Sequence, residues 1–317
     1  MSIKMKNLLT HLQHPNSTKD YQAEDEPDAI KISEYWGRRI DQNQKPKISF
    51  ELFPPKSDSA NKLLKKTHQK LSEINPDYFS VTFGALGLSQ NDTFDTVADL
   101  SENTKIPIIP HLTCVGIDKK QVTDLLDEYI AQGVNQIMVL KGDYPKTIIK
   151  KGDFNYANEM VEFIKENYLD INILVAAYPE KHPHSNCISK DIDFFVNKVN
   201  AGADEAVTQY FYNIDAYLHF IEEVQKRNID IPITPGIMPI TNYDQLIYFS
   251  KACGAEIPAW ILNKLKLYKN DLNSLKEFGE DVVSEMCLKL KDNGVSSFHF
   301  YCLNKAEPTL SIVKKIT

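Results

Sequence analysis

Residues 106–142 read IPIIPHLTCVGIDKKQVTDLLDEYIAQGVNQIMVLKG and contain two apolar runs, 106–113 and 136–142, on either side of an amphipathic segment at 118–133. Continuous apolar runs are typical of parallel strands that are covered on both faces. The segment between them has helical length and ends in glycine, which is a helix-stop signal. This stretch therefore predicts one strand–helix–strand unit.

The same pattern recurs along the chain from Lys47 onward. Amphipathic segments separate eight apolar runs, and the runs follow one another at roughly thirty residues, the size of one strand–helix unit. The runs are 48–53, 78–84, 106–113, 136–142, 171–179, 205–212, 231–239 and 297–304. Eight such units predict an α/β protein with a closed (β/α)8 barrel, the TIM barrel. A doubly wound sheet is the alternative, but no G-x-G-x-x-G follows the first run.

Two further features complete the predicted organisation. The gap between the seventh and eighth runs is about twice the usual length of a unit, so we expect extra helices before the last strand. Residues 1–45 are polar, with one helix-like piece around 30–40, and form an N-terminal extension. Residues 46–317 form the single barrel domain.

The charge balance limits the ligands that the protein can hold. The 317 residues carry 36 Lys and Arg against 43 Asp and Glu, a net charge of -7, which argues against a nucleic-acid partner. Arginine occurs only at 38, 39 and 227. A site for an anionic cofactor must therefore use lysines, backbone N–H groups and helix N-termini.

Cysteine usage and hydropathy indicate a cytoplasmic protein with no membrane partner. The five cysteines are an odd number, widely spaced and without C-x-x-C, as expected of reduced thiols. No apolar stretch approaches the roughly 18 residues of a membrane span, and the N-terminus lacks the apolar core of a signal peptide. No His, Cys and Asp set has the spacing of a metal site.

Polar residues stand at the C-terminal ends of the apolar runs, where a barrel of this type places its chemistry. They are Glu51, Thr82, His111, Asp143, Tyr178, Gln209, Asn304 and Lys305, with His182 in the loop beyond Tyr178. Glu51 lies inside the run ISFELF, ahead of Pro54 and Pro55. A carboxylate is costly to bury there unless it is paired or protonated. It is therefore a general acid with a raised pKa or one partner of an ion pair inside the barrel.

The other rim residues keep alternative interpretations. Asp143 follows Gly142, which allows close backbone approach, so it fits a ligand contact. It equally fits a turn or a helix cap. His111 fits a ligand contact or a core histidine, and Gln209 fits a ligand contact or an internal hydrogen bond. Tyr178 and His182 suit stacking on a planar ring or a structural loop. Asp191 and Lys198, seven residues apart, lie on one helix face, which is either functional or solvated.

Ten ordered motifs resemble the methylenetetrahydrofolate reductase family. They extend from about residue 47 to 310 and are FELFPPK (50–56), SVTFGA (80–85), PHLTC (110–114), LKGD (140–143), VAAYPEKHP (175–183), KVNAGAD (198–204), TQYFY (208–212), ITPGIMPI (233–240), IPAW (257–260) and HFYCLNK (299–305). The resemblance is to the short bacterial form. It implies a cytoplasmic, oligomeric flavoprotein of one-carbon metabolism with a (β/α)8 barrel.

The resemblance also implies a reaction. The family uses NADH or NADPH to reduce FAD, which then reduces 5,10-methylenetetrahydrofolate to 5-methyltetrahydrofolate by ping-pong kinetics. The few arginines favour NADH, because they are too few to suggest a dedicated clamp for a 2′-phosphate. Glu51 would protonate N10 of the folate, and Asp143 would tune the flavin and help bind the pterin. The folate would contact Gln209, Gln245, Phe249 and Lys305. The FAD site would comprise Thr82, Phe83, Ala85, His111, Lys141, Gly142, Asp143, Tyr178, His182, Asp191 and Lys198.

The chain departs from the family pattern at four positions. Lys141 and Lys305 stand where arginine is common, and Phe194 and Asn197 replace polar or basic contacts. Lysine keeps the charge but loses the bidentate fork, so we expect retained function with weaker binding of FAD or folate. Two alternatives remain: a Schiff-base lyase that uses Lys141, which borohydride would trap, and a non-catalytic flavin- or folate-binding relative. The presence of both Glu51 and Asp143 argues against the second.

Overall fold

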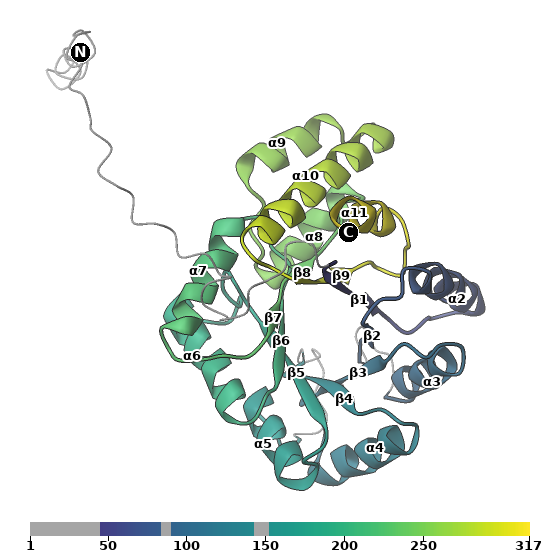
Figure 1. Ribbon diagram of the computed structural model, residues 1–317, viewed down its shortest axis with the longest axis vertical. Coiled ribbons are helices and arrows are strands. Elements are labelled where there is room, and N and C mark those ends of the chain that lie inside the picture. Colours follow the sequence, from purple (N-terminus) through teal and green to yellow (C-terminus); the bar gives the residue numbers. More distant parts are fainter. Residues whose placement is uncertain (1–44, 84–89, 143–151) are drawn as a thin grey trace, which may run out of the picture.

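The computed structural model describes residues 45–83, 90–142 and 152–317, without the side chains of residues 90 and 91 (Figure 1). Ala85 and Asp143, two of the predicted site residues, lie outside the described residues. So does the helix-like piece around residues 30–40 of the expected N-terminal extension.

The strands of the described part form one parallel sheet that curves into a barrel (Figure 1). They are β1 (Lys47–Leu52), β2 (Tyr78–Val81), β3 (Ile108–Thr113), β4 (Gln136–Leu140), β5 (Asn172–Ala177), β6 (Glu205–Thr208), β7 (Ile233–Thr234), β8 (Gly236–Ile237) and β9 (Ser297–Tyr301). The order is β7-β6-β5-β4-β3-β2-β1-β9-β8. Strands β2 to β9 fall within the predicted runs, and β1 begins one residue before the first run, at Lys47, which confirms the (β/α)8 prediction.

The run 231–239 supplies two short strands that together close the barrel. β7 pairs with β6 and β8 pairs with β9, so the two halves bridge the edges of the sheet. Pro235 separates them because it has no N–H for the ladder, although its carbonyl accepts the N–H of His299 at 3.0 Å. The N–H of Gly236 donates to Thr208 Oγ1 at 2.9 Å. A Cβ at Gly236 would lie 2.1 Å from the backbone oxygen of Thr208, so only glycine fits at this closure.

Helices form the outer layer around the barrel (Figure 1). They are α2 (Asp58–Ser72), α3 (Gln90–Ser101), α4 (Lys119–Ala131), α5 (Ala157–Asn167), α6 (Ile188–Asn200), α7 (Ile214–Gln225), α8 (Tyr243–Cys253), α9 (Ala259–Leu267), α10 (Leu272–Asp292) and α11 (Thr309–Ile316). Three of them, α8 to α10, lie between β8 and β9, which confirms the extra helices before the last strand. Helix α4 begins with a capping box in which Asp118 and Gln121 bond each other's backbone N–H groups.

Both faces of the strands are buried, which explains the continuous apolar runs. Outward-facing side chains such as Phe50, Phe79 and Phe298 are fully buried in the large core shared with the helices. A second, small cluster consists of Ile109, Met138, Leu174 and Val207, which alternate with residues of the large core and fill the interior of the barrel. In the stretches that the structure describes, no helix is long and apolar enough to cross a membrane.

Candidate active site

Glu51 and His111 lie together at the C-terminal end of the barrel strands. Glu51 is the next-to-last residue of β1 and His111 belongs to β3. The distance from Glu51 Oε2 to His111 Nε2 is 3.9 Å, and the two side chains are 22% and 3% exposed. The register places Glu51 level with Ser80 of β2 and Tyr301 of β9, so its carboxyl group enters the barrel interior.

Burial sets the protonation states of this pair. Desolvation raises the pKa of Glu51 to about 8 and lowers the pKa of His111 to about 3. At neutral pH the carboxyl group is therefore protonated and the imidazole is neutral. The pair is not a salt bridge, which argues against the ion-pair alternative for Glu51. A protonated carboxyl group at the rim is what a general acid requires.

The end of β1 is held by the loop that follows β9. Asn304 accepts the N–H of Phe53 through Oδ1 at 3.0 Å and donates Nδ2–H to the carbonyl of Phe53 at 2.8 Å. The carbonyl of Asn304 in turn accepts the hydroxyl of Thr67 on α2 at 3.0 Å. The Asn304 backbone has a positive φ of 53°, which asparagine tolerates better than most residues. These bonds fix the strand end two residues beyond Glu51.

A group of polar side chains below Glu51 was missed by the sequence analysis. Ser49 Oγ lies 2.8 Å from His299 Nδ1, and the ring of Tyr78 stacks on His299 with centroids 5.6 Å apart. Within the described part of the chain, the buried atoms His111 Nε2, Ser80 Oγ and His299 Nε2 have no hydrogen-bond partner. The signal was present: Ser49 and Ser80 share the inward period of two with Glu51 and Tyr78.

The loop after β5 and helix α6 bring four predicted residues together. The rings of Tyr178 and His182 meet edge to face with centroids 4.8 Å apart. Asp191 Oδ2 accepts the N–H of His182 at 2.8 Å. Lys198 donates from Nζ to the carbonyl of Ala176 in β5. Asp191 and Lys198 therefore bond the backbone of the barrel and its loop, and do not form a solvated face.

Protonation in this group is also shifted by burial. Desolvation lowers the pKa of Lys198 to about 8, with Asp191 opposing the shift. It also lowers the pKa of His182, so the ring is neutral at neutral pH. Because His182 Nδ1 accepts the N–H of His184 at 3.1 Å, the ring proton resides on Nε2. The group can offer a neutral aromatic surface beside a titratable amine.

Lys141 and Gly142 follow β4. The amine of Lys141 lies 5.1 Å from the ring centroid of Tyr156. Gly142 has a φ of 78°, and a Cβ there would lie 2.9 Å from Cβ of Thr113. The backbone conformation and Thr113 thus require glycine by themselves, whereas the sequence had suggested approach by a ligand.

The remaining predicted residues lie at other points of the rim. Thr82 and Phe83 follow β2 and are half-buried. Gln209 accepts the N–H of Tyr210 through Oε1 at 3.0 Å, which leaves its side-chain NH₂ for a ligand. Gln245 of α8 and the exposed Lys305 both line a cavity of about 830 Å³, together with residues of α10 and α11. Phe249 is half-buried one turn further along α8.

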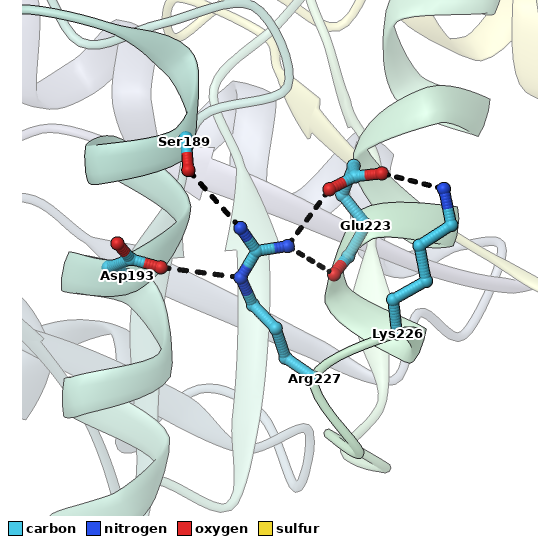
Figure 2. A network of polar contacts seen from close by, with 5 residues as sticks. All are labelled: Ser189, Asp193, Glu223, Lys226 and Arg227. Carbon is cyan, nitrogen blue, oxygen red and sulfur yellow. Dashed lines mark hydrogen bonds and ion pairs between the residues drawn. The ribbon is translucent and has the colours of Figure 1, made fainter.

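Arg227, the arginine within the described residues, does not belong to the rim. It joins α7 to α6 on the outside of the barrel (Figure 2). Its guanidinium contacts Asp193 at 3.3 Å, Ser189 at 3.4 Å and Glu223 at 2.9 Å. Hydrogen bonds from Lys226 and Arg227 lower the pKa of Glu223 to about 2. The contacts hold α6 from outside, while Asp191 and Lys198 hold it to the barrel.

A family profile described as methylenetetrahydrofolate reductase matches residues 37–317. The chain belongs to this family. The match confirms the resemblance carried by the ten motifs, and membership supports an enzyme that reduces methylenetetrahydrofolate. No three His, Cys, Asp or Glu side chains gather as a metal site in the part of the chain that the structure describes.

Known proteins of the family are similar over most of the chain. The chain is 38% identical over 270 residues to 5,10-methylenetetrahydrofolate reductase of Buchnera aphidicola subsp. Schizaphis graminum. The aligned residues make up 85% of this chain and 91% of the relative. The chain is 33% identical over 265 residues to the enzyme of Escherichia coli, with 84% and 88% covered. A rice protein named probable methylenetetrahydrofolate reductase (NADH) is 31% identical over 283 residues, which are 85% of this chain and 48% of the rice protein.

Solved structures share the barrel at low sequence identity. An uncharacterized protein from Clostridium thermocellum that binds two copies of 5-methyl-5,6,7,8-tetrahydrofolic acid superposes with a TM-score of 0.59 and 16% identity, covering 90% of this chain and 98% of that one. Oxaloacetate acetylhydrolase superposes with a TM-score of 0.51 and 10% identity, covering 90% and 84%. At these identities the likeness shows the fold alone.

Proposed function

We propose that this protein is an FAD-dependent reductase that converts 5,10-methylenetetrahydrofolate to 5-methyltetrahydrofolate with electrons from NADH. The observation that carries the proposal is the half-buried carboxyl group of Glu51 at the barrel rim, 3.9 Å from the buried His111 and with a pKa raised to about 8 by desolvation. Opening of the five-membered folate ring needs a proton at N10, and Glu51 holds one at neutral pH. Family membership supplies the substrate class.

The residues at the rim fit a flavin. The buried His111 Nε2 has no partner among the described residues, so it is available to a hydrogen-bonding ring system. Tyr178 and His182 offer an aromatic edge, and Lys198 with Lys141 supplies positive charge for phosphates in place of arginine. FAD, when bound, supplies the redox chemistry by accepting a hydride from the nicotinamide and donating it to the folate. Thr82, Phe83, Ala85, Gly142, Asp143 and Asp191 complete the proposed FAD site.

The folate is proposed to lie between Glu51 and α8. Gln209 offers its side-chain NH₂, Gln245 and Lys305 line one cavity, and Phe249 supplies an apolar face. Lys305 would meet the carboxylates of the substrate as a point charge. Asp143 would stand near both ligands. The folate-binding barrel from Clostridium thermocellum supports a folate site in this fold.

NADH is proposed as the electron donor. The name of the rice relative specifies NADH, and arginines that would clamp a 2′-phosphate are scarce in this chain. Thr82 and Gln209 would contact the nucleotide when the folate is absent. Alternate occupation of one pocket by two substrates produces ping-pong kinetics. A homo-oligomer remains a prediction.

The purified protein is expected to be yellow and to lose its visible absorbance when NADH is added without oxygen. NADPH should act more slowly, because arginines, the planar cations that would clamp its 2′-phosphate, are scarce in this chain. Stopped-flow absorbance with each nucleotide measures both rates. A colourless protein that takes up no FAD during reconstitution would contradict the proposal, and faster bleaching by NADPH would overturn the choice of nucleotide.

A further inference from the structure

Glu180 lies in the loop after β5, beside residues assigned to the flavin, and reaches a different part of the molecule. Its Oε2 accepts the backbone N–H of Glu256, at 2.8 Å, in the connection between α8 and α9. The two residues are 76 positions apart in the chain. One side chain therefore joins the loop that carries Tyr178 and His182 to the end of the helix that carries Gln245 and Phe249.

A second contact brings the same two segments together. Gly254 ends α8 with a φ of 80° and donates its N–H to the carbonyl of Ser250. A Cβ at Gly254 would lie 3.1 Å from the carbonyl oxygen of Lys181 and 3.2 Å from Cγ of Pro183. The glycine thus serves both the left-handed helix end and the close approach of the loop.

A third contact holds α8 on the neighbouring strand. The hydroxyl of Tyr210, two residues after β6, lies 3.1 Å from Oγ of Ser250, and both side chains are buried. The C-terminal half of α8 is therefore attached to the ends of β5 and β6. Its N-terminal half lines the cavity through Gln245.

Glu180 is an unusual residue to use for this attachment. Its Oε1 is buried and has no hydrogen-bond partner in the described ranges. Burial and the nearby charge of Glu256 raise its pKa to about 7, against the effect of the backbone hydrogen bond. The side chains of Tyr210 and Glu256 interact electrostatically with Glu180. The neighbouring amine of Lys181 donates its hydrogen bond to the carbonyl of Ser185. A buried carboxyl oxygen without a partner lowers the stability of the fold. A residue that carries this cost calls for a role beyond packing.

We propose that Glu180 is a positioning residue that holds α8 against the loop after β5 and so aligns the folate-binding side chains with the flavin-binding ones. The inference rests on the proposed function for the identity of the two ligands. The contact itself, between Glu180 and the N–H of Glu256, is independent of that function. When the contact is removed, the connection after α8 is held less firmly on the loop, and both ligands lose part of their alignment.

The test compares three variants of the full chain. Glu180→Ala removes the acceptor, and Glu180→Gln keeps an oxygen for the Glu256 N–H. Glu256→Ala is the matched control, because it removes the exposed side chain of Glu256 and leaves the backbone donor in place. With Glu180→Ala we expect KM for the folate to rise about 10-fold, the worth of one hydrogen bond at about 1.4 kcal/mol. The dissociation constant of FAD, from titration of the apoprotein, should also rise, while kcat changes less.

Glu180→Gln is expected to restore both constants to within about twofold, and Glu256→Ala to leave them unchanged. Equal losses in the Ala and Gln variants would overturn the positioning role. So would a fall in melting temperature for Glu180→Ala with unchanged KM and FAD affinity, which would mark a purely structural residue.

Hydrogen exchange separates a failure of this proposal from a failure of the proposed function. In the apoprotein, the amide of Glu256 should exchange at least about 10-fold faster in Glu180→Ala and at the wild-type rate in Glu180→Gln. Unchanged exchange in Glu180→Ala would show that the contact does not hold α8 and would overturn the proposal. This measurement needs neither FAD nor folate, so it decides the contact even in a protein that binds neither.

Discussion

Glu51→Gln is expected to slow reduction of the folate by about 10²–10⁴-fold, the usual contribution of a general acid. Glutamine has the shape of the protonated carboxyl group but no proton to deliver to N10. Bleaching by NADH needs no such proton and should proceed at the wild-type rate. Anaerobic stopped-flow absorbance measures the two half-reactions separately.

The pH dependence of the folate step provides a second test of Glu51 as the general acid. The pKa of Glu51 is raised to about 8, so the acid form is lost, and the folate step slows, as the pH rises through that value. Stability has the same sign. The folded protein holds the proton more tightly than the unfolded chain, whose Glu pKa is 4.5, so stability falls as the pH rises from about 4.5 to about 8.

Glu51→Gln should flatten both profiles. The matched control is Glu102→Gln, because Glu102 is exposed on the outside of the barrel after α3. This control should keep the wild-type rates and profiles. Loss of both half-reactions in Glu51→Gln, with an unchanged melting temperature, would contradict the role of Glu51 as the acid of the folate step alone.

Gly236→Ala is expected to destabilise the protein by about 3 kcal/mol or more, at or beyond the upper end of overpacking effects. The added Cβ would lie 2.1 Å from the carbonyl oxygen of Thr208 and 2.6 Å from the ring of Tyr301. Tyr301 is itself held by a 2.7 Å hydrogen bond from its hydroxyl to that carbonyl. Neither neighbour can withdraw without opening the barrel between β6 and β9. Urea unfolding followed by circular dichroism measures the change.

Gly133→Ala is the control for this substitution. Gly133 has a positive φ of 84°, but no atom lies within 4 Å of its Cβ position. Alanine there should cost only about 1 kcal/mol of backbone strain. If both variants lose the same stability, the clash at Gly236 is relieved by small shifts, and closure of the barrel does not depend on glycine.

Local pattern was sufficient to predict the barrel. The run 106–113 contains β3, the segment 118–133 contains α4 and the run 136–142 contains β4. The two strands are buried on both faces and α4 buries its apolar face, as these patterns predict. The seventh run differs. Residues 231–239 look like one strand, but Pro235 cannot donate to the ladder, so two short strands pair with different neighbours.

The chemical state of the candidate site depends on contacts that no local pattern specifies. The position of Glu51 inside an apolar run was enough to predict a paired or protonated carboxyl group. The choice between them depended on its neighbour, His111, which register brings from β3 and burial keeps neutral. The contact of Glu180 with the Glu256 N–H likewise depends on the path of two loops. Contacts of this kind, between residues far apart in the sequence, are set by the packing of the whole barrel.

We propose that this protein reduces a folate with electrons taken from a nicotinamide nucleotide. Anaerobic protein is first bleached with one equivalent of NADH and then mixed with 5,10-methylenetetrahydrofolate. The visible absorbance should return, and the amount of 5-methyltetrahydrofolate formed should equal the amount of flavin reoxidised. Absorbance that stays bleached, or that returns without 5-methyltetrahydrofolate, would contradict the proposed function.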